Sequence, residues 1–287
     1  MPDPTKAKLY ALAAIALWAL LATLGVALKH VPPFLLTGIA LLIGSLLALP
    51  SVLKDPGQWK ISGSTLALGV YGLFGYHFLL FIALRYAPPV EANLVNYLWP
   101  LLIVVLAPLF LPGLHLRAVH VAAALLGFAG ATIAILGSGA SGNAADPGGA
   151  WHWGYLLAMA AAFMWASYSL MTKRVRHFPT AAIGLFGLVS GLLSLLCHWL
   201  LEPQAALSGQ DWLLLLVMGL GPLGAAFFLW DKALKLGDAR QIGILSYITP
   251  LASTALLMLA SGRALSWNIG LAALLILGAA VLGTRAR

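Results

Sequence analysis

The chain has 287 residues, of which 62% are hydrophobic and 8% are charged, and its mean hydropathy is +0.97. Soluble globular domains carry about 25% charged residues, so this composition excludes an ordinary soluble enzyme and indicates a membrane protein. The formal net charge is +8, and Cys197 is the single cysteine, which excludes an intrachain disulfide and a cysteine-based metal site.

Ten stretches of the chain reach the roughly 20 apolar residues that a transmembrane helix needs. In chain order they cover residues 8–29, 33–53, 64–85, 90–111, 117–137, 152–173, 180–201, 211–232, 239–260 and 266–284. The longest connection, 138–151, is rich in Gly, Ser and Ala. We therefore predict an all-α polytopic membrane protein with ten transmembrane helices, in which 138–151 links two five-helix units, 1–137 and 152–287.

Two sequence blocks, 150 residues apart, indicate that these units are repeats. Ala83-Leu84-Arg85 closes the third segment, and Ala233-Leu234-Lys235 closes the eighth. A Tyr-x-x-Pro motif follows in the next segment of each unit. Trp18 matches Trp165 at a spacing of 147, so the first segment belongs to the duplicated fold rather than to a signal peptide. Because each unit crosses the membrane an odd number of times, the repeats are expected to be inverted, with a substrate site near the midplane between them.

The basic residues orient the segments in the membrane. With the N-terminus in the cytoplasm, thirteen of the 16 Lys and Arg residues face the cytoplasm, and only Lys29, Arg85 and Arg263 lie outside. This is the positive-inside bias, so both termini are predicted to be cytoplasmic (N-in/C-in) and the linker 138–151 extracytoplasmic. The same bias accounts for the positive net charge without a nucleic-acid partner.

The ten segments, the five-plus-five duplication and the two Ala-Leu-basic … Tyr-x-x-Pro blocks resemble the drug/metabolite transporter superfamily, in its EamA-type branch. The resemblance covers essentially the whole chain. A further set of residues resembles the bacterial aromatic amino-acid exporters of that branch: Trp18, Tyr76, Asn93, Asn96, Tyr97, Trp99, Pro100 and Trp165.

This resemblance implies a secondary transporter of the bacterial inner membrane, embedded in the lipid bilayer, that exports aromatic and other neutral amino acids. No cofactor and no metal are expected, and no Gly-rich phosphate loop for ATP is present in the sequence. We predict no catalytic residues, because Ser190 and His198 are too far apart on one helix for the dyad of an intramembrane protease. The alternative is an exporter of another small metabolite or lipophilic compound.

Three tryptophans and a histidine lie away from the membrane interfaces, where aromatic belts are expected. Trp18, Trp99 and Trp165 are close to the centres of their segments, and His77 is near the centre of the third. A tryptophan at that depth needs a partner for its indole N–H or lines a wet cavity. We interpret these residues as a pocket that stacks a substrate ring or holds an ammonium group over a π face; the alternative is packing between helices. Further candidates for substrate binding are Tyr76 and Tyr168.

The fourth segment carries a second polar signal. One helix face of this segment presents, at the spacing i, i+3, i+4 and i+7, the residues Asn93, Asn96, Tyr97 and Pro100. Pro100 frees a backbone carbonyl one turn earlier, and Pro250 does the same in the ninth segment, so both helices gain an acceptor and a place to bend. We expect the three polar residues, and the counterpart Tyr247, to bind the substrate; the alternative is that they join neighbouring helices.

Charged residues at two turns are candidates for gates. Arg85 and Glu91 flank the turn after the third segment, and Asp231 and Lys235 lie at the matching turn after the eighth. Because inverted repeats exchange sides, one turn is expected to be tight while the other is open, with ion pairs holding each state and the two prolines as hinges. The alternative is that these charges anchor helix ends by snorkelling.

No Asp or Glu lies in the middle of a predicted segment: Glu91 begins the fourth and Asp231 ends the eighth. Since proton-driven exporters usually need a buried carboxylate or histidine relay, we predict a facilitator that works by alternating access, with proton coupling through His77 as the alternative. We expect a monomer. A dimer is the alternative, because Gly127 and Gly130 suit close helix packing within or between chains.

Overall fold

The computed structural model describes residues 3–137, 153–260, 262 and 267–285. The predicted linker 138–151 therefore lies outside the described residues. Within them every regular element is a helix and no strand is present. The prediction of an all-α protein is confirmed for this part of the chain.

The first half of the chain contains nine α-helices and three short turns of other helix types. In chain order the elements are α1 (Pro4–Ala19), α2 (Leu21–Ala27), α3 (Pro33–Ser45), η1 (Leu46–Ala48), α4 (Leu49–Lys54), η2 (Pro56–Trp59), α5 (Gly63–Val70), η3 (Tyr71–Gly75), α6 (Tyr76–Tyr86), α7 (Pro89–Asn96), α8 (Trp99–Phe110) and α9 (Ala118–Gly137). In the described part of the second half they are α10 (Trp153–Met171), α11 (Ala182–Leu201), α12 (Gly209–Leu220), η4 (Gly221–Ala225), α13 (Ala226–Leu236), α14 (Ala239–Leu245), α15 (Ile248–Ala260) and α16 (Trp267–Arg285).

Many of these elements join into stretches that are long and apolar enough to cross a membrane. Among the described residues there are nine: Pro4–Ala27, Pro33–Lys54, Gly63–Tyr86, Glu91–Phe110, Ala118–Leu136, Trp153–Met171, Ala182–Leu201, Gly209–Leu236 and Ala239–Ala260. The tenth predicted segment corresponds to α16, whose apolar part Trp267–Gly283 is shorter. The chain is therefore a polytopic membrane protein.

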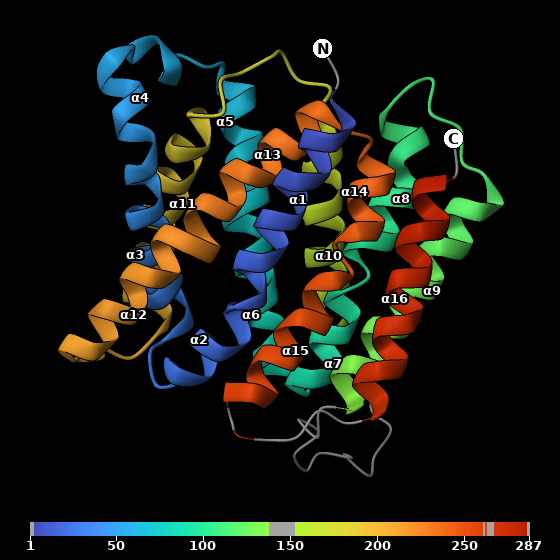
Figure 1. Ribbon diagram of the computed structural model, residues 1–287. Coiled ribbons are helices and arrows are strands. Elements are labelled where there is room, and N and C mark those ends of the chain that lie inside the picture. Colours follow the sequence, from blue (N-terminus) through green and yellow to red (C-terminus); the bar gives the residue numbers. More distant parts are fainter. Residues whose placement is uncertain (1–2, 138–152, 261, 263–266, 286–287) are drawn as a thin grey trace.

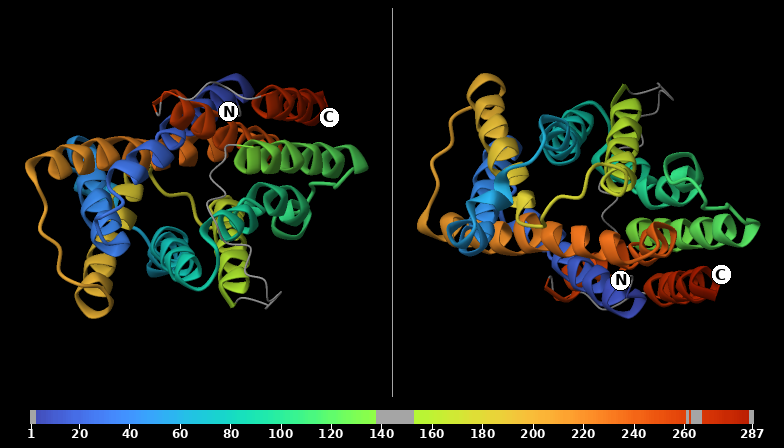
Figure 2. Two further views of the ribbon diagram at one scale, coloured as in Figure 1. Left: turned by 90° about the horizontal axis from the view of Figure 1, so that it is seen from below. Right: turned by 90° about the horizontal axis from the view of Figure 1, so that it is seen from above.

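The helices stand side by side in one bundle, and both marked ends of the chain lie at the same end of it (Figure 1). We call this end the termini face; α4 also lies there. The opposite end, with α2 and α7, we call the mouth face (Figure 1). Views along the bundle axis show α9 and α16 at one edge and α3, α11 and α12 at the other (Figure 2). Between these edges, α1 packs on α13 and α10 packs on α6.

The fourth spanning stretch breaks within its predicted helix. α7 ends at Asn96, Tyr97 and Leu98 form a turn, and α8 starts at Trp99. Pro100 has no N–H to donate to the carbonyl of Asn96, so the helical ladder is interrupted there. The segment predicted over 90–111 therefore consists of two helices joined by a turn, and its polar residues lie at the end of the first helix and in this turn.

The ninth spanning stretch breaks at the matching place, between α14 and α15. Here the N–H of Thr249 donates to the carbonyl of Ser246 with an N–O distance of 3.0 Å. We expected Pro250 to leave this carbonyl free, and that expectation is wrong because the chain tightens to a three-residue turn. The two breaks therefore occupy matching positions but differ in whether the carbonyl already has a donor.

Two further stretches contain π-helical turns at matching places. η3 and η4 begin 150 residues apart, directly before Tyr76 of α6 and Ala226 of α13. Such turns are rare and occur frequently at functional sites, because they rotate the residues that follow relative to an ordinary helix. Here they set the orientation of the two helices that meet in the middle of the bundle.

Glycines of α9 permit close packing inside the chain. A Cβ atom on Gly127 would lie 2.5 Å from the ring of Tyr247, and one on Gly130 would lie 2.7 Å from the side chain of Ile276. Real Cβ atoms do not approach that closely, so only glycine fits at either position. These two glycines therefore serve contacts within one chain.

Candidate substrate cavity

A cavity of about 520 Å³ lies in the half of the bundle next to the mouth face. Its lining extends from Trp18, Trp99 and Trp165 to Lys29, an exposed residue after α2. Helices of both halves contribute: α1, α2, α3, α6, α7 and α8 from the first, and α10, α12, η4, α13 and α15 from the second. Small-molecule sites typically enclose ~300–1,000 Å³, so the space suits a compact ligand.

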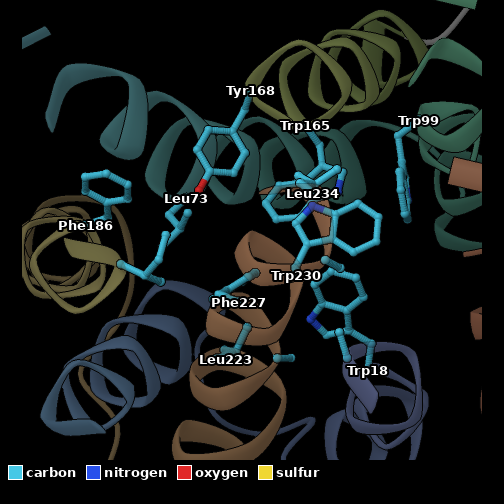
Figure 3. Packing of buried hydrophobic residues seen from close by; sticks show 14 of the residues in the cluster. Trp18, Leu73, Trp99, Trp165, Tyr168, Phe186, Leu223, Phe227, Trp230 and Leu234 are labelled. Carbon is cyan, nitrogen blue, oxygen red and sulfur yellow. The ribbon is translucent and has the colours of Figure 1, made fainter. Parts of the chain in front are cut away.

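Five aromatic rings pack together at the deep end of this cavity, and we call them the aromatic floor: Trp18, Trp99, Trp165, Phe227 and Trp230 (Figure 3). Ring centroids are 5.8 Å apart for Trp18 and Trp165, and 5.2 Å apart for Trp18 and Trp230. These are favourable separations for edge-to-face and tilted pairs. The lining contains no residue of α1 before Trp18 and none of α13 after Phe227. The cavity thus ends at the floor.

The floor contains two kinds of indole group. The Nε1–H of Trp18 donates to the carbonyl of Pro222, in the π-turn η4, with an N–O distance of 3.1 Å. The indole N–H groups of Trp99 and Trp165 have no acceptor among the described residues, and both side chains line the cavity. Two donors therefore remain available to a ligand on the floor.

His77 lies in the cavity wall on the first turn of α6. Its Nδ1 is 2.6 Å from the carbonyl oxygen of Leu73, in the π-turn η3. A carbonyl oxygen only accepts, so Nδ1 carries the hydrogen, and in the neutral ring Nε2 is left as an acceptor. The backbone thus orients the ring and gives His77 the polarity needed to accept a hydrogen bond from a ligand.

Four polar residues complete the middle of the cavity, and all four were predicted as binding residues: Tyr76, Asn93, Asn96 and Tyr97. The side-chain amide of Asn96 donates to the hydroxyl of Tyr76 with an N–O distance of 3.1 Å, while its Oδ1 has no partner among the described residues. The last turn of α7 and the break after it position this set. The cavity wall therefore offers uncharged donors and acceptors.

Two other predicted binding residues lie outside the cavity lining. Tyr168 is 3% exposed and packs behind the floor, its ring centroid 5.3 Å from that of Trp165. Tyr247 is fully buried and packs against Gly127 and Phe128 of α9. Both positions correspond to packing between helices, the alternative considered for residues of this kind.

Charged side chains at the mouth face form a network that the sequence analysis did not predict. Arg85 donates to a carboxylate oxygen of Glu202 at 3.0 Å, and Nδ1 of His198 lies 3.0 Å from the other oxygen. The Glu202 carboxylate also accepts from the first two backbone N–H groups of α3, which caps that helix. Glu91, which flanks the same turn as Arg85, instead accepts a hydrogen bond from the hydroxyl of Tyr155.

Asp231 lies inside the spanning stretch Gly209–Leu236 and is 3% exposed. The prediction that it ends a segment is wrong, because the helix continues one turn beyond residue 232. Its Oδ2 accepts from the Thr180 hydroxyl at 2.6 Å and from the Lys235 ammonium at 2.7 Å, while Oδ1 has no partner among the described residues. Lys235 also donates to the carbonyl of Phe178 at 2.9 Å. The termini face is closed here by α11 and α13.

The chemistry of the cavity is that of a binding site for an uncharged or zwitterionic molecule. Lys29, at the mouth, is the one Lys, Arg, Asp or Glu in the lining. Among the described residues no group of three or more His, Cys, Asp and Glu side chains is placed to hold a metal ion. Apart from Lys29 at the mouth, no charged side chain of the described residues in this wall is placed to compensate a phosphate or a lone cationic charge.

The sequence matches the model of the EamA-like transporter family over residues 5–136 and again over residues 152–285. The chain belongs to this family. The resemblance to EamA-type members of the drug/metabolite transporter superfamily is thereby confirmed, and one family match falls in each half. Membership indicates a transporter rather than an enzyme.

Individual relatives cover nearly the whole chain. It is 43% identical to the aromatic amino acid exporter YddG of Ancylobacter novellus, over 98% of this chain and 97% of the relative. It is 30% identical to the aromatic amino acid exporter YddG of Salmonella typhimurium, with 94% of both chains covered. A solved crystal structure of 41% sequence identity superposes with a TM-score of 0.88 over 97% of each chain. The helical arrangement is thus shared with a solved structure of a related sequence.

Proposed function

We propose that this EamA-family member exports aromatic and other neutral amino acids across the bacterial inner membrane. The cavity supports this proposal most directly, because Trp18, Trp99 and Trp165 line its deep end and uncharged polar groups line its wall. Two relatives named aromatic amino acid exporters point to the same substrate class.

We propose that the termini face is cytoplasmic, in keeping with the positive-inside bias. One family match in each half, and π-turns 150 residues apart, support two repeats of opposite membrane orientation. The mouth face is then extracytoplasmic. In this arrangement the cavity faces outward, and the aromatic floor and the Asp231–Lys235 contact separate it from the cytoplasm.

In the proposed complex the substrate ring rests on the aromatic floor, where each ring pair contributes ~0.5–1.5 kcal/mol beyond its area burial. Nε2 of His77 accepts from the substrate ammonium, and the free indole N–H groups of Trp99 and Trp165 donate to its carboxylate. Because the wall carries no fixed charge at this depth, a substrate whose own charges cancel is favoured over a phosphorylated or cationic one.

Transport in this proposal proceeds by alternating access without proton coupling. The contacts at the termini face open while the mouth closes, and the breaks at 97–98 and 246–247 provide places for the helices to bend. No carboxylate of the described residues lines the cavity, and Asp231 lies beyond its floor in contact with Lys235. A driving force other than the substrate gradient is therefore not needed; the alternative is proton coupling through His77.

Efflux from vesicles that hold the purified protein tests this function. The vesicles are loaded with labelled phenylalanine, tryptophan, threonine or glutamate, with and without a proton gradient. We expect efflux of the three neutral amino acids at rates that ignore the proton gradient, and no efflux of glutamate. Efflux that follows the gradient, and is lost in His77→Gln, would establish proton coupling instead. No amino-acid efflux would overturn the substrate class.

A further inference from the structure

Asp231 and Lys235, one turn apart on α13, are arranged as more than an ion pair that fastens this helix to the segment before α11. The carboxylate is buried, yet its Oδ1 has no partner among the described residues. The Lys235 ammonium, besides contacting Asp231, lies 4.0 Å from the ring centroid of Phe178. Leaving a buried carboxylate oxygen unbonded is costly, and a latch would have no use for it. Such an atom is explained if it has a partner in another state of the molecule.

The position of Asp231 relative to the aromatic floor suggests what this partner is. Asp231 follows Trp230, which belongs to the floor, is 1% exposed and donates its indole N–H to Ser169. The carboxylate therefore lies just beyond the floor, on its termini-face side. On this side of the floor an aromatic surface, a carboxylate and an ammonium group occur together. The described lining of the cavity on the other side contains no carboxylate.

The match between the repeats shows which groups line a cavity when the termini face opens. At a spacing of 150 residues, Asp231 corresponds to Phe81 and Leu234 corresponds to Leu84. Phe81 and Leu84 both line the cavity that is open to the mouth face. If the repeats exchange conformations, as the proposed function requires, the carboxylate of Asp231 lines the corresponding cavity on the termini face.

The facing helix gives the same result. Pro32 matches Pro179 at the spacing of 147 already seen for the tryptophans, so Val31 corresponds to Phe178 and Pro33 to Thr180. Val31 and Pro33 line the open cavity. Their counterparts are the groups that now contact Lys235 and Asp231. The present contacts are therefore made between two walls that separate in the other state.

We propose that Asp231 and Lys235 form a binding site for zwitterionic amino acids in the state that is open to the termini face. The substrate ammonium binds Asp231, its carboxylate binds Lys235, and its ring contacts Trp230. The inference rests on the proposed function, since it needs alternating access. Separating the two side chains leaves two charges without partners, and a zwitterion supplies both. At the mouth, Phe81 corresponds to Asp231 and Arg85 to Lys235, so the release side keeps a positive charge but has no carboxylate in the corresponding place.

Vesicles that hold the protein in a single orientation test this proposal, because substrate is then presented to each face separately. The probes are phenylalanine, 3-phenylpropionate, which lacks the ammonium group, and phenethylamine, which lacks the carboxylate. At the termini face the wild type is expected to have a KM for phenylalanine about tenfold or more below its KM for each analogue, the scale of discrimination that a lost polar group brings. Asp231→Asn should reduce the preference over 3-phenylpropionate, and Lys235→Gln the preference over phenethylamine.

Two controls make the outcome decisive. At the mouth face, both variants should still transport phenylalanine, which shows that they are folded. Asp238, at the same end of the bundle, is paired with Arg240. Burial raises the pKa of the Asp238 carboxyl, but the contacts with Arg240 outweigh this effect, so the pKa lies below its ordinary value. Asp238→Asn removes the same charge from this face and should leave the discrimination unchanged.

The two roles predict different results. If Asp231 and Lys235 only hold the gate, the variants change the rates of all three compounds by the same factor, and the proposal is overturned. A change in the ratio of KM values between phenylalanine and its analogues that is equal at both faces also overturns it. If the wild type moves no amino acid from either face, the proposed function fails first; if it does and discrimination is unaffected, only this inference fails.

Discussion

The ends of α6 and α13 are counterparts 150 residues apart, yet they treat their charges in opposite ways. At the mouth face, Arg85 reaches from α6 to Glu202, directly after α11, and Phe81 lines the open cavity. At the termini face, Lys235 contacts Asp231 on its own helix and two groups before α11. One set of charges joins helices beside an open space, and the other closes the space itself.

This difference shows how one duplicated unit can give a transporter with unlike ends. The helices and their irregular turns match between the halves, so the framework for opening is shared. The side chains at the ends have diverged, so in the proposed alternating-access cycle the contacts that stabilise the two closed states need not be equal. In the structure, the polar contacts around Asp231 are intact and the mouth is open.

Removing one charged partner at the termini face and one at the mouth face should give the largest difference in stability between the two ends. The Asp231 and Lys235 side chains are 2% and 21% exposed, whereas Arg85 is 39% exposed. Asp231→Ala should lower the free energy of unfolding by about 2–4 kcal/mol, since it leaves a largely buried ammonium group without its partner. Arg85→Ala should cost about 1 kcal/mol, because Glu202 keeps His198 and the start of α3.

Thermal unfolding in detergent measures both effects. The probe of unfolding is the reactivity of the single thiol, Cys197, which is half-buried. Lys6→Ala is a suitable control, because its ion pair with Asp3 is exposed. Equal losses for Asp231→Ala and Arg85→Ala would show that the two ends contribute alike.

The aromatic floor lies between the two ends. Substitution of its tryptophans should slow the transport of aromatic amino acids more than that of threonine. Trp99→Ala and Trp165→Ala should slow transport of phenylalanine and tryptophan by about tenfold, or ~1.4 kcal/mol, and transport of threonine only about twofold, because threonine has no ring to stack. Efflux rates in vesicles measure both. Trp199, which is 70% exposed on α11, provides the matched control Trp199→Ala. An equal loss for all substrates would assign the tryptophans to packing.

A substitution of Glu202 tests whether the mouth-face network stabilises the protein mainly by capping the start of α3. Glu202→Gln keeps the size of the side chain but removes the charge that caps α3 and pairs with Arg85. We expect a loss of about 1 kcal/mol in stability, the usual contribution of a charge at a helix N-terminus together with an ion pair. Glu91→Gln, at the same face, should cost less, since Glu91 is exposed. A thermal shift larger for Glu91→Gln would contradict this account.

Much of the cavity could be predicted because it depends on depth along a helix. Trp18, Trp99, Trp165 and His77 are near the centres of apolar segments, and residues at equal depth in adjacent helices meet near the same level. Which way a side chain turns around its helix is a separate matter. Tyr168 and Tyr247 have the right depth, but the packing of α10 behind the floor and of α15 on α9 turns them away from the cavity.

The charges were harder to predict for two physical reasons. Apolarity decides where a segment seems to end, and Lys232 and Lys235 concealed the last turn of α13, so the depth of Asp231 and Trp230 was missed. Glu202 lies just after the seventh segment and 117 residues from Arg85. Only the folded chain brings Glu202 and Arg85 together. In the sequence, the one indication of this contact was that Glu202 directly follows an apolar stretch.

The two helix breaks before Pro100 and Pro250 should respond differently to loss of the proline, although both effects on transport are expected to be small. Pro100→Ala restores an N–H that can bond the Asn96 carbonyl and straighten α7 onto α8, which would shift Asn93 and Tyr97 in the cavity wall. At the other break, Thr249 already donates to the Ser246 carbonyl at 3.0 Å, so Pro250→Ala adds a donor where none is needed.

We therefore expect Pro100→Ala to slow efflux of phenylalanine about threefold, or ~0.7 kcal/mol, and Pro250→Ala to leave it within about 1.5-fold of wild type. Single-turnover efflux from vesicles resolves changes of that size, and Pro108→Ala in the same helix, α8, controls for the general effect of removing a proline. Similar slowing by Pro100→Ala and Pro250→Ala would mean that both breaks bend during transport. The difference in their carbonyl bonding would then have no part in the motion, and the asymmetry between the halves would be confined to the charges at their ends.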